Sequence, residues 1–200
     1  MMKKILVIAL ALLVGAQAHA QLVAKAAFLN ASDRSKFDNN VNSVNLSGFS
    51  LGAEYKIALP FVDGLGVAPG ANVNFLFGSE NEFRYSDIAL NIPLHATYSF
   101  DFGRDFRAYA FGGPSAQIGL IKNSKYTVGN QTNSVNYYSN ESSSTYNRFM
   151  LLLGLGAGVE VAEMIQVSVG VDFGVTPFFR NDYIRVRRPY QLKIGVGYLF

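Results

Sequence analysis

The residues best suited to catalysis are a histidine and two hydroxyl side chains spaced two apart, His95, Thr97 and Ser99. Acyl transfer needs a nucleophile such as Ser or Thr beside a base, usually His. His95 is the only candidate base outside the N-terminal twenty residues. A histidine that only hydrogen-bonds inside the fold is the simpler interpretation. The chain has no Cys, which excludes Cys-ligated zinc and iron–sulfur sites, and His95 with scattered carboxylates gives no metal-ligand spacing. Neither a metal site nor a cofactor is predicted.

Phosphate recognition is the second chemistry that the residue types allow. Guanidinium groups bind phosphate through two parallel hydrogen bonds, which makes clustered arginines candidates for anion contacts. Four arginines gather in one short segment near the C-terminus: Arg180, Arg185, Arg187 and Arg188. Ordinary solvation of a charged segment is the alternative interpretation.

The first twenty residues have the three parts of a secretory signal peptide. Lys3 and Lys4 precede twelve apolar residues, and the small residues of Ala18-His19-Ala20 follow. The apolar run is too short for a membrane-spanning helix, which needs about 20 residues. We predict cleavage between Ala20 and Gln21, leaving a domain of residues 21–200. The mature net charge is then 15 minus 14, or +1, because Lys3 and Lys4 leave. With no Lys/Arg stripe either, we expect no nucleic-acid partner.

Apolar residues alternate with small or polar ones along nearly all of the remaining chain. In 165–175, for example, Ile and Val alternate with Gln, Ser, Gly and Asp. Successive side chains of a strand point to opposite faces, so this period predicts strands with one apolar face. The eight predicted strands cover residues 22–30, 46–59, 66–78, 87–100, 106–121, 148–161, 165–177 and 189–200. In the fifth, Gly112-Gly113-Pro114 predicts a bulge, because Pro cannot donate to a ladder.

The connections between these strands alternate in length. The predicted long ones are 31–45, 79–86, 122–147 and 178–188, and the predicted short ones are 60–65, 101–105 and 162–164. An antiparallel up-and-down meander then has long loops at one end and short turns at the other, as transmembrane barrels have. The longest connection, 122–147, holds six Asn, six Ser and four Tyr, a composition able to form an adaptable contact surface or a solvated loop.

Composition indicates which face of the barrel points outward. The non-apolar face is dominated by Gly, Ser and Asn, which suit the narrow interior of eight strands. The apolar face is continuous and carries aromatics near strand ends, including Tyr98, Phe100, Tyr198 and Phe200. This fits a lipid-facing exterior edged by aromatic residues. Because backbone groups in hydrocarbon have no water to bond, the sheet must close, so 22–30 should pair with 190–200 in antiparallel orientation.

Several charged side chains fall on the inward face of the predicted strands. A charge inside a narrow barrel must be paired or hydrated, so these residues predict a network that fills the lumen. Folding the last hairpin should bring Asp172 beside Lys193. The alternative is a hydrated path for very small solutes. The predicted network consists of Lys25, Glu54, Lys56, Arg107, Arg148, Glu160, Asp172 and Lys193.

Four segments resemble the porin-family small outer-membrane β-barrel proteins, whose barrel domain is OmpX-like and eight-stranded. They are Lys25-Ala26-Ala27-Phe28-Leu29-Asn30, Leu90-Asn91-Ile92-Pro93-Leu94, Gly112-Gly113-Pro114 and Gly195-Val196-Gly197-Tyr198-Leu199-Phe200. Ala27 departs from the family pattern, which has Gly there. The resemblance implies residence in the outer membrane of a Gram-negative bacterium. It also implies that Tyr198 and Phe200 belong to the signal read by the outer-membrane assembly machinery.

These patterns predict an integral membrane protein whose barrel displays outer loops for interaction. A narrow porin for very small solutes is the alternative, and a lipid-modifying enzyme based on His95 is a remote one. The series from His95 to Ser99 runs toward a short turn, away from the end where surface lipids arrive, so no catalytic residue is predicted. Expected partners are outer-membrane lipid and lipopolysaccharide, which the four arginines would contact. We expect a monomer, because a closed barrel has no free edge.

Overall fold

The computed structural model describes residues 20–37, 40–80, 82–103, 105–128, 131–138, 147–177, 179–180 and 184–200. Within these ranges no helix is both long enough and apolar enough to cross a membrane. Most of the predicted signal peptide, residues 1–19, lies outside the described residues. So does 139–146 of the predicted long connection 122–147.

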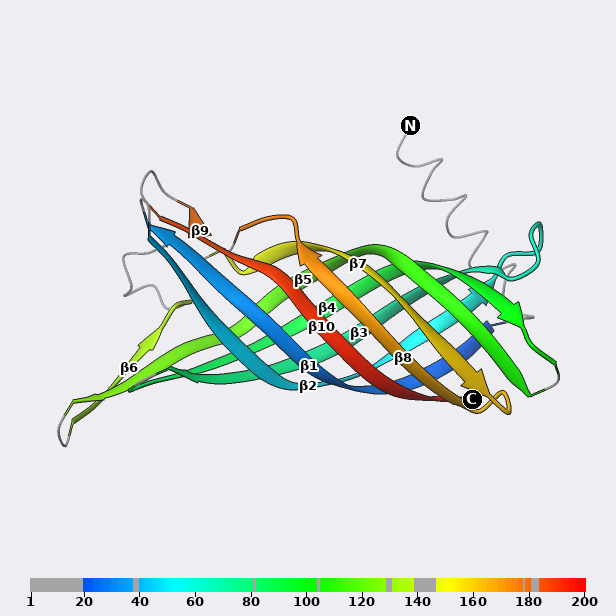
Figure 1. The fold of residues 1–200 in the computed structure, drawn as a ribbon, viewed down its shortest axis with the longest axis horizontal. Coiled ribbons are helices and arrows are strands. Elements are labelled where there is room, and N and C mark those ends of the chain that lie inside the picture. The colour runs from blue at the N-terminus through cyan, green and yellow to red at the C-terminus, as the bar shows by residue number, and fades with distance from the viewer. Residues whose placement is uncertain are drawn as a thin grey trace.

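The described chain forms one antiparallel sheet that closes into a barrel (Figure 1). Eight long strands follow each other around the wall, and a pairing between the first and last of them closes it, as predicted. Two short strands, β6 and β9, pair with β5 and β10. The strands are β1 Ala20–Phe37, β2 Asn40–Ala58, β3 Leu65–Glu80, β4 Phe83–Asp101, β5 Phe106–Val128, β6 Gln131–Asn136, β7 Phe149–Val161, β8 Ile165–Gly174, β9 Phe179–Arg180 and β10 Ile184–Leu199.

The closing seam joins β1 to β10 in the predicted direction. Val23 pairs with Leu199, and the ladder runs without interruption to Ser32 opposite Tyr190. It resumes with Arg34 opposite Arg187 and continues to Phe37. The wall therefore has no open edge along this seam, which satisfies the requirement that backbone groups in hydrocarbon pair within the protein.

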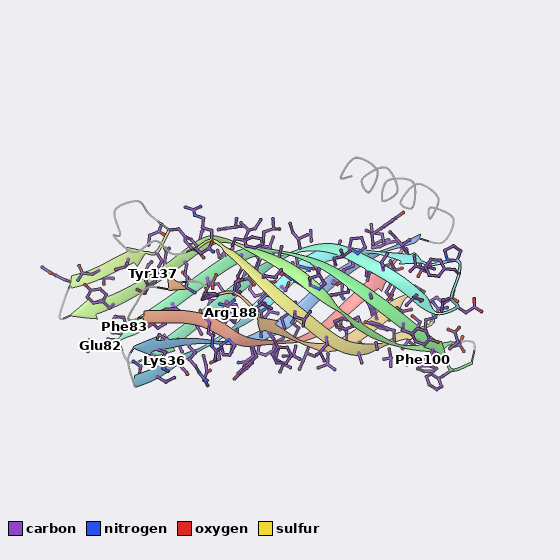
Figure 2. All side chains as sticks on the ribbon, turned by 90° about the horizontal axis from the view of Figure 1, so that it is seen from above. Lys36, Glu82, Phe83, Phe100, Tyr137 and Arg188 are labelled. Atoms are coloured by element: carbon purple, nitrogen blue, oxygen red, sulfur yellow. The ribbon has the colours of Figure 1, made fainter. Side chains whose placement is uncertain are left out.

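The exterior of the barrel is apolar and its interior is polar, as the composition of the two faces predicted. Leu153, Phe173 and Ile194 are 51%, 43% and 51% exposed, on the outer surface. Asn91, Gln166 and Asp172, which face inward, are nearly inaccessible. Figure 2 shows side chains projecting from the outside of the wall along its whole length. Amides, charges and small residues thus fill much of the interior. Two small apolar clusters are buried among them: Leu29, Ala31, Leu46 and Leu76, and Met150 with Leu152.

The turns at one end are short, as predicted. They connect β2 to β3, β4 to β5 and β7 to β8. The last of them has three residues, 162–164, of which Ala162 and Glu163 both have positive φ, 52° and 56°, as the central residues of a type I′ turn do.

The strands at the other end extend beyond the boundaries that the sequence predicted. Residues 31–37 and 40–45 continue β1 and β2 in register, so the predicted loop 31–45 is mostly a hairpin. Likewise β3 and β4 extend the ladder to Glu80 opposite Phe83 within predicted loop 79–86. Part of 122–147 forms the hairpin of β5 with β6, and β10 begins within 178–188. These extensions lack a continuous apolar face, so the sequence resembled loops, but cross-strand hydrogen bonds hold them as sheet.

The predicted bulge at Gly112-Gly113-Pro114 is wrong. Between β4 and β5 the register is the same before and after this segment, with Pro93 opposite Ser115 and Ala96 opposite Gly112. The shift occurs further along, where Ile88 pairs with Ile121 but Ala89 pairs with Gly119. Leu120 is the extra residue, and Leu120 and Ile121 are both exposed.

A second bulge lies in β10 at Pro189. Between Ser32 and Arg34 of β1, the partner in β10 changes from Tyr190 to Arg187, which leaves one additional residue on β10. Proline within a sheet is confined to edges and bulges because it cannot donate to the ladder. Each bulge reverses which side chains of its strand point inward beyond it. This places Lys122 and Arg188 inside the barrel.

Cleavage of the first twenty residues is tested by the mass of the mature chain. We expect protein purified from outer membranes to begin at Gln21, because the small residues at positions 18 and 20 fit signal peptidase. Intact mass spectrometry measures this directly, and an Ala18→Leu variant is expected to retain the precursor mass. A wild-type protein that begins at Met1 would contradict the prediction.

Candidate functional site: the lumen ion pairs and the rim

Four charged side chains meet in the lumen beneath the end that bears the extended strands. Arg188 donates from Nε to Asp33 Oδ1 at 2.7 Å and from Nη2 to Asp87 Oδ2 at 2.7 Å. Lys122 Nζ lies 2.8 Å from Asp33 Oδ2 and 3.2 Å from Asp87 Oδ2. Arg188 has no exposed surface. We call Asp33, Asp87, Lys122 and Arg188 the plug cluster.

The plug cluster joins opposite walls of the barrel. Asp33 and Arg188 come from the adjacent strands β1 and β10, and Asp87 and Lys122 come from the adjacent strands β4 and β5. Its two positive and two negative charges balance. Arg188 Nη1 also donates to Gln191 Oε1 at 3.2 Å. The alternation of side chains does not predict Lys122, Asp33 or the inward position of Arg188. The signal available was Pro189, whose position in a strand predicts a bulge.

A second set of ion pairs lies toward the short-turn end. Lys25 Nζ is 3.0 Å from Glu54 Oε2, Lys56 pairs with Glu160, and Lys193 pairs with Asp172. Arg107 lies at the mouth, 2.7 Å from Asp101 and 3.7 Å from Glu160. Seven of the eight residues predicted for the lumen network therefore line this half, together with Asp101. Four bases meet four acids in these ion pairs, so this set of residues is also neutral.

Arg148 does not belong to the lumen network. It is exposed at the rim, where its Nη2 donates to the backbone oxygen of Tyr138 at 3.0 Å and its guanidinium lies 5.1 Å from the Tyr138 ring. The Tyr138 ring in turn covers the inward face of Gly119, where a Cβ would meet the ring. A segment of the predicted long loop is thus folded over the mouth, and Arg148 holds it there.

The four arginines predicted to contact anionic lipid do not share one environment. Arg188 is wrong for this role, because the bulge at Pro189 turns it into the lumen. Arg187 is exposed on the outside. Arg185 and Arg180 are opposite each other in the β9–β10 ladder, and their side chains lie outside what the structure describes.

His95 lies inside the barrel, 5% exposed, with its ring 5.1 Å from that of Phe111. Its Nε2 is buried without a hydrogen-bond partner in the described part of the protein. It lines a cavity of about 50 Å³ with Lys25, Glu54 and Lys193. Thr97 and Ser99 lie lower, in an open vestibule of about 740 Å³ at the short-turn end. Across the described ranges, no three His, Asp or Glu side chains are grouped to hold a metal ion.

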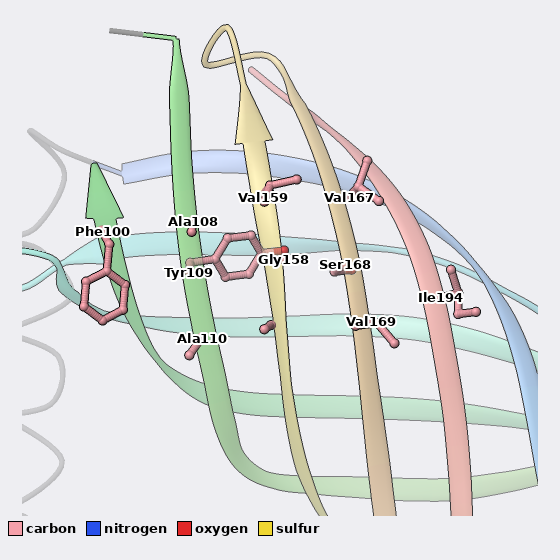
Figure 3. A pocket seen from close by; sticks show the side chains of 11 residues that line it. Phe100, Ala108, Tyr109, Ala110, Gly158, Val159, Val167, Ser168, Val169 and Ile194 are labelled. Carbon is pink, nitrogen blue, oxygen red and sulfur yellow. The ribbon is translucent and has the colours of Figure 1, made fainter. Parts of the chain in front are cut away.

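A shallow apolar hollow lies on the exterior near the short-turn end (Figure 3). It measures about 550 Å³ and crosses β5, β7 and β8, where the small residues Ala108, Ala110 and Ala157 leave room between larger neighbours. Phe100 and Ile194 flank it. Tyr198 and Phe200, the predicted assembly signal, are exposed at the same end, with ring centroids 4.9 Å apart.

The family model described as outer membrane protein beta-barrel domain matches residues 14–180. The chain belongs to this family. Its apolar exterior is therefore the lipid-facing wall of an outer-membrane barrel, and membership indicates the outer membrane of a Gram-negative bacterium. Short turns lie on the periplasmic side of such barrels and longer connections outside. The plug cluster then lies toward the extracellular end, and the vestibule opens to the periplasm.

Several solved outer-membrane barrels have a similar fold. OprG from Pseudomonas aeruginosa is 15% identical with a TM-score of 0.50, over 90% of this chain and 95% of that one. Ail, the attachment invasion locus protein of Yersinia pestis, is 15% identical with a TM-score of 0.46, over 90% and 99%. Neisserial surface protein A is 14% identical with a TM-score of 0.45, over 90% and 97%. Among curated proteins, none matches this outer-membrane barrel.

Proposed function

We propose that this outer-membrane barrel is a non-conducting protein that acts through its extracellular strands and loops. The plug cluster is the observation that carries the proposal. It ties β1 and β10 to β4 and β5 across the lumen through two carboxylates and two cations. An ion entering from outside would have to break charge-assisted hydrogen bonds among groups that have little access to water.

A small pocket lies on the extracellular side of the plug cluster. Asp33, Asp87 and Lys122 form its floor, and Tyr85 and Tyr137 contribute to its wall, around a volume of about 180 Å³. Beyond it the β5–β6 hairpin extends past the barrel, with every residue of β6 exposed (Figure 1). Tyr-rich, polar segments displayed on a rigid support favour binding of another surface, since Tyr provides contact area at low entropic cost.

Planar bilayer recording tests whether the lumen conducts. We expect reconstituted protein to give no steady large channels, because the ion pairs of the plug cluster span the lumen between opposite walls. The interior of an eight-stranded barrel is just wide enough for side chains to fill it, which leaves little space for a channel. Steady openings of uniform conductance would contradict the proposal. An Arg187→Gln variant, whose side chain is on the outer wall, is expected to stay equally silent and serves as the control.

A narrow porin is the second candidate, and the polar interior favours it. Buried side-chain amide atoms of Asn91, Gln117 and Gln166 have no partner within the described residues, and such groups are costly unless water bonds them. With the vestibule and the cavity at His95, they support a hydrated column below the plug cluster. Liposomes containing a pH-sensitive dye distinguish the candidates: steady proton flux without large channels supports the narrow porin.

The position of His95 supports a role without catalysis. It is buried in the periplasmic half of the lumen. Within the described residues, its Nε2 makes no hydrogen bond to a hydroxyl group that could act as a nucleophile. A lipid in the outer leaflet would have to cross the wall or the plug cluster to reach it. Recognition of Tyr198 and Phe200 by the assembly machinery stays a prediction of the family resemblance.

A further inference from the structure

Four basic residues lie opposite one another in the ladder of the closing seam, and three of them are on its outward face. Arg34 is directly across from Arg187, and Lys36 is directly across from Arg185, in the ladder between β1 and β10. Arg34, Lys36 and Arg187 are exposed. We call these four residues the seam patch. Figure 2 shows Lys36 at the extracellular end, far from Phe100 at the other end.

The positive charges of the seam patch are not balanced by nearby acidic side chains in the described part of the chain. Like charges directly opposite each other in an antiparallel pair destabilise the sheet. Arg34, Lys36 and Arg187 make no ion pair with any acid in the described part of the chain. The nearest acid along β1, Asp33, points inward and is already bonded to Arg188 and Lys122. An external anion is therefore needed to relieve the repulsion across the seam.

The height of the seam patch along the barrel identifies that anion. The outward residues of β10 run from Ile194 through Leu192 to Tyr190, all more than a third exposed, and Arg187 follows after the bulge. Apolar, then aromatic, then basic side chains in this order match hydrocarbon, interface and headgroup. The patch thus lies where the phosphates of outer-leaflet lipid are, on the wall rather than in the loops.

We propose that the seam patch binds a phosphate group of lipopolysaccharide and that this phosphate bridges the first and last strands. Arginine forks on β1 and β10 can each donate two hydrogen bonds to one phosphate. The bound lipid then replaces repulsion across the closing seam with attraction. The proposal rests on the proposed orientation of the barrel in the outer membrane, and it makes the seam depend on the lipid around it.

A matched pair of double variants tests the proposal. Arg34→Gln with Arg187→Gln removes two opposed cations from the seam patch. Arg84→Gln with Lys125→Gln removes two opposed, exposed cations from β4 and β5 at the same end, away from the seam. Folding of each variant is checked first by its heat-dependent mobility in detergent gels. Binding is then measured in phosphatidylcholine nanodiscs with lipid A carrying two phosphates, and with the dephosphorylated lipid.

The seam variant is expected to bind two-phosphate lipid A roughly 30-fold more weakly than the wild type, while the control variant stays near the wild-type affinity. The same lipid should raise the unfolding midpoint of the wild type but not of the seam variant. Equal loss in both variants would leave only general charge attraction and overturn the proposal. So would equal binding of dephosphorylated lipid. Either result leaves the bilayer recordings, and thus the proposed function, unaffected.

Discussion

Replacing Arg188 with Gln is expected to lower the free energy of unfolding by about 3–5 kcal/mol. Arg188 is fully buried, donates two hydrogen bonds to Asp33 and also reaches Asp87. Without it, two buried carboxylates share the single charge of Lys122, and uncompensated buried charge is costly. Equilibrium urea unfolding in phosphatidylcholine vesicles measures the change in unfolding free energy. It can be followed by circular dichroism and by tyrosine fluorescence, because the chain has no Trp.

The neighbouring residue provides the control for this experiment. Arg187 is exposed on the outer face, so Arg187→Gln in the same neutral lipid should change the unfolding free energy by less than about 0.5 kcal/mol. Adding Asp87→Asn to Arg188→Gln restores the charge balance and should recover part of the loss, as a double-mutant cycle would reveal. Equal effects of the two single variants would mean that the bulge at Pro189 does not turn Arg188 inward.

Placing a charge on the lipid-facing wall is expected to have the second largest effect. Leu155 is the central residue of β7 and is 54% exposed on the outside. Leu155→Arg should destabilise the barrel by about 2–4 kcal/mol, the cost of an arginine near the bilayer midplane. Unfolding in vesicles of defined thickness measures this, and a thinner bilayer should reduce the penalty because the side chain can reach the interface.

The depth dependence of that penalty distinguishes lipid from other apolar surroundings. Val159, on the same face of β7 but two residues from its end, should cost only about 0–1 kcal/mol when changed to Arg. If the interior rather than the exterior were apolar, Leu155→Arg would prevent folding altogether and Val159→Arg would be nearly as damaging. A flat response along β7 would contradict the membrane orientation.

The alternation of side chains predicted most of the barrel because a single rule applies to every strand within the lipid. Hydrocarbon outside and a narrow lumen inside force one apolar and one small or polar face, as in Leu153 against Gly154. The same rule predicted Lys193 beside Asp172, which form an ion pair. It predicted the closure of β1 on β10 as well, since no edge can remain unpaired in hydrocarbon.

The rule failed where its physical cause ends. Above the lipid, the side chains of Ser35 and Lys36 point to opposite faces of β1, but neither residue is apolar. The sequence of β1 therefore resembles a loop there. At Leu120 and Pro189 one additional residue reverses the alternation, and parity then assigns Lys122 and Arg188 to the wrong side. Gly112-Gly113-Pro114 carried the stronger local signal for a bulge, but the ladder on both sides of it keeps one register. A true bulge can be distinguished from a segment that only resembles one by knowing which residues of the neighbouring strand lie opposite it.

The two bulges also determine where this protein can be recombined with its relatives. Grafting an extracellular hairpin from another barrel usually joins the parts at the visible strand ends. Here a junction made below Leu120 or Pro189 would discard the additional residue, and every transplanted side chain above it would exchange inside for outside. Chimaeras should therefore keep both bulges with the recipient barrel. A junction in β5 belongs after Lys122 and a junction in β10 before Arg187, on the extracellular side of each bulge.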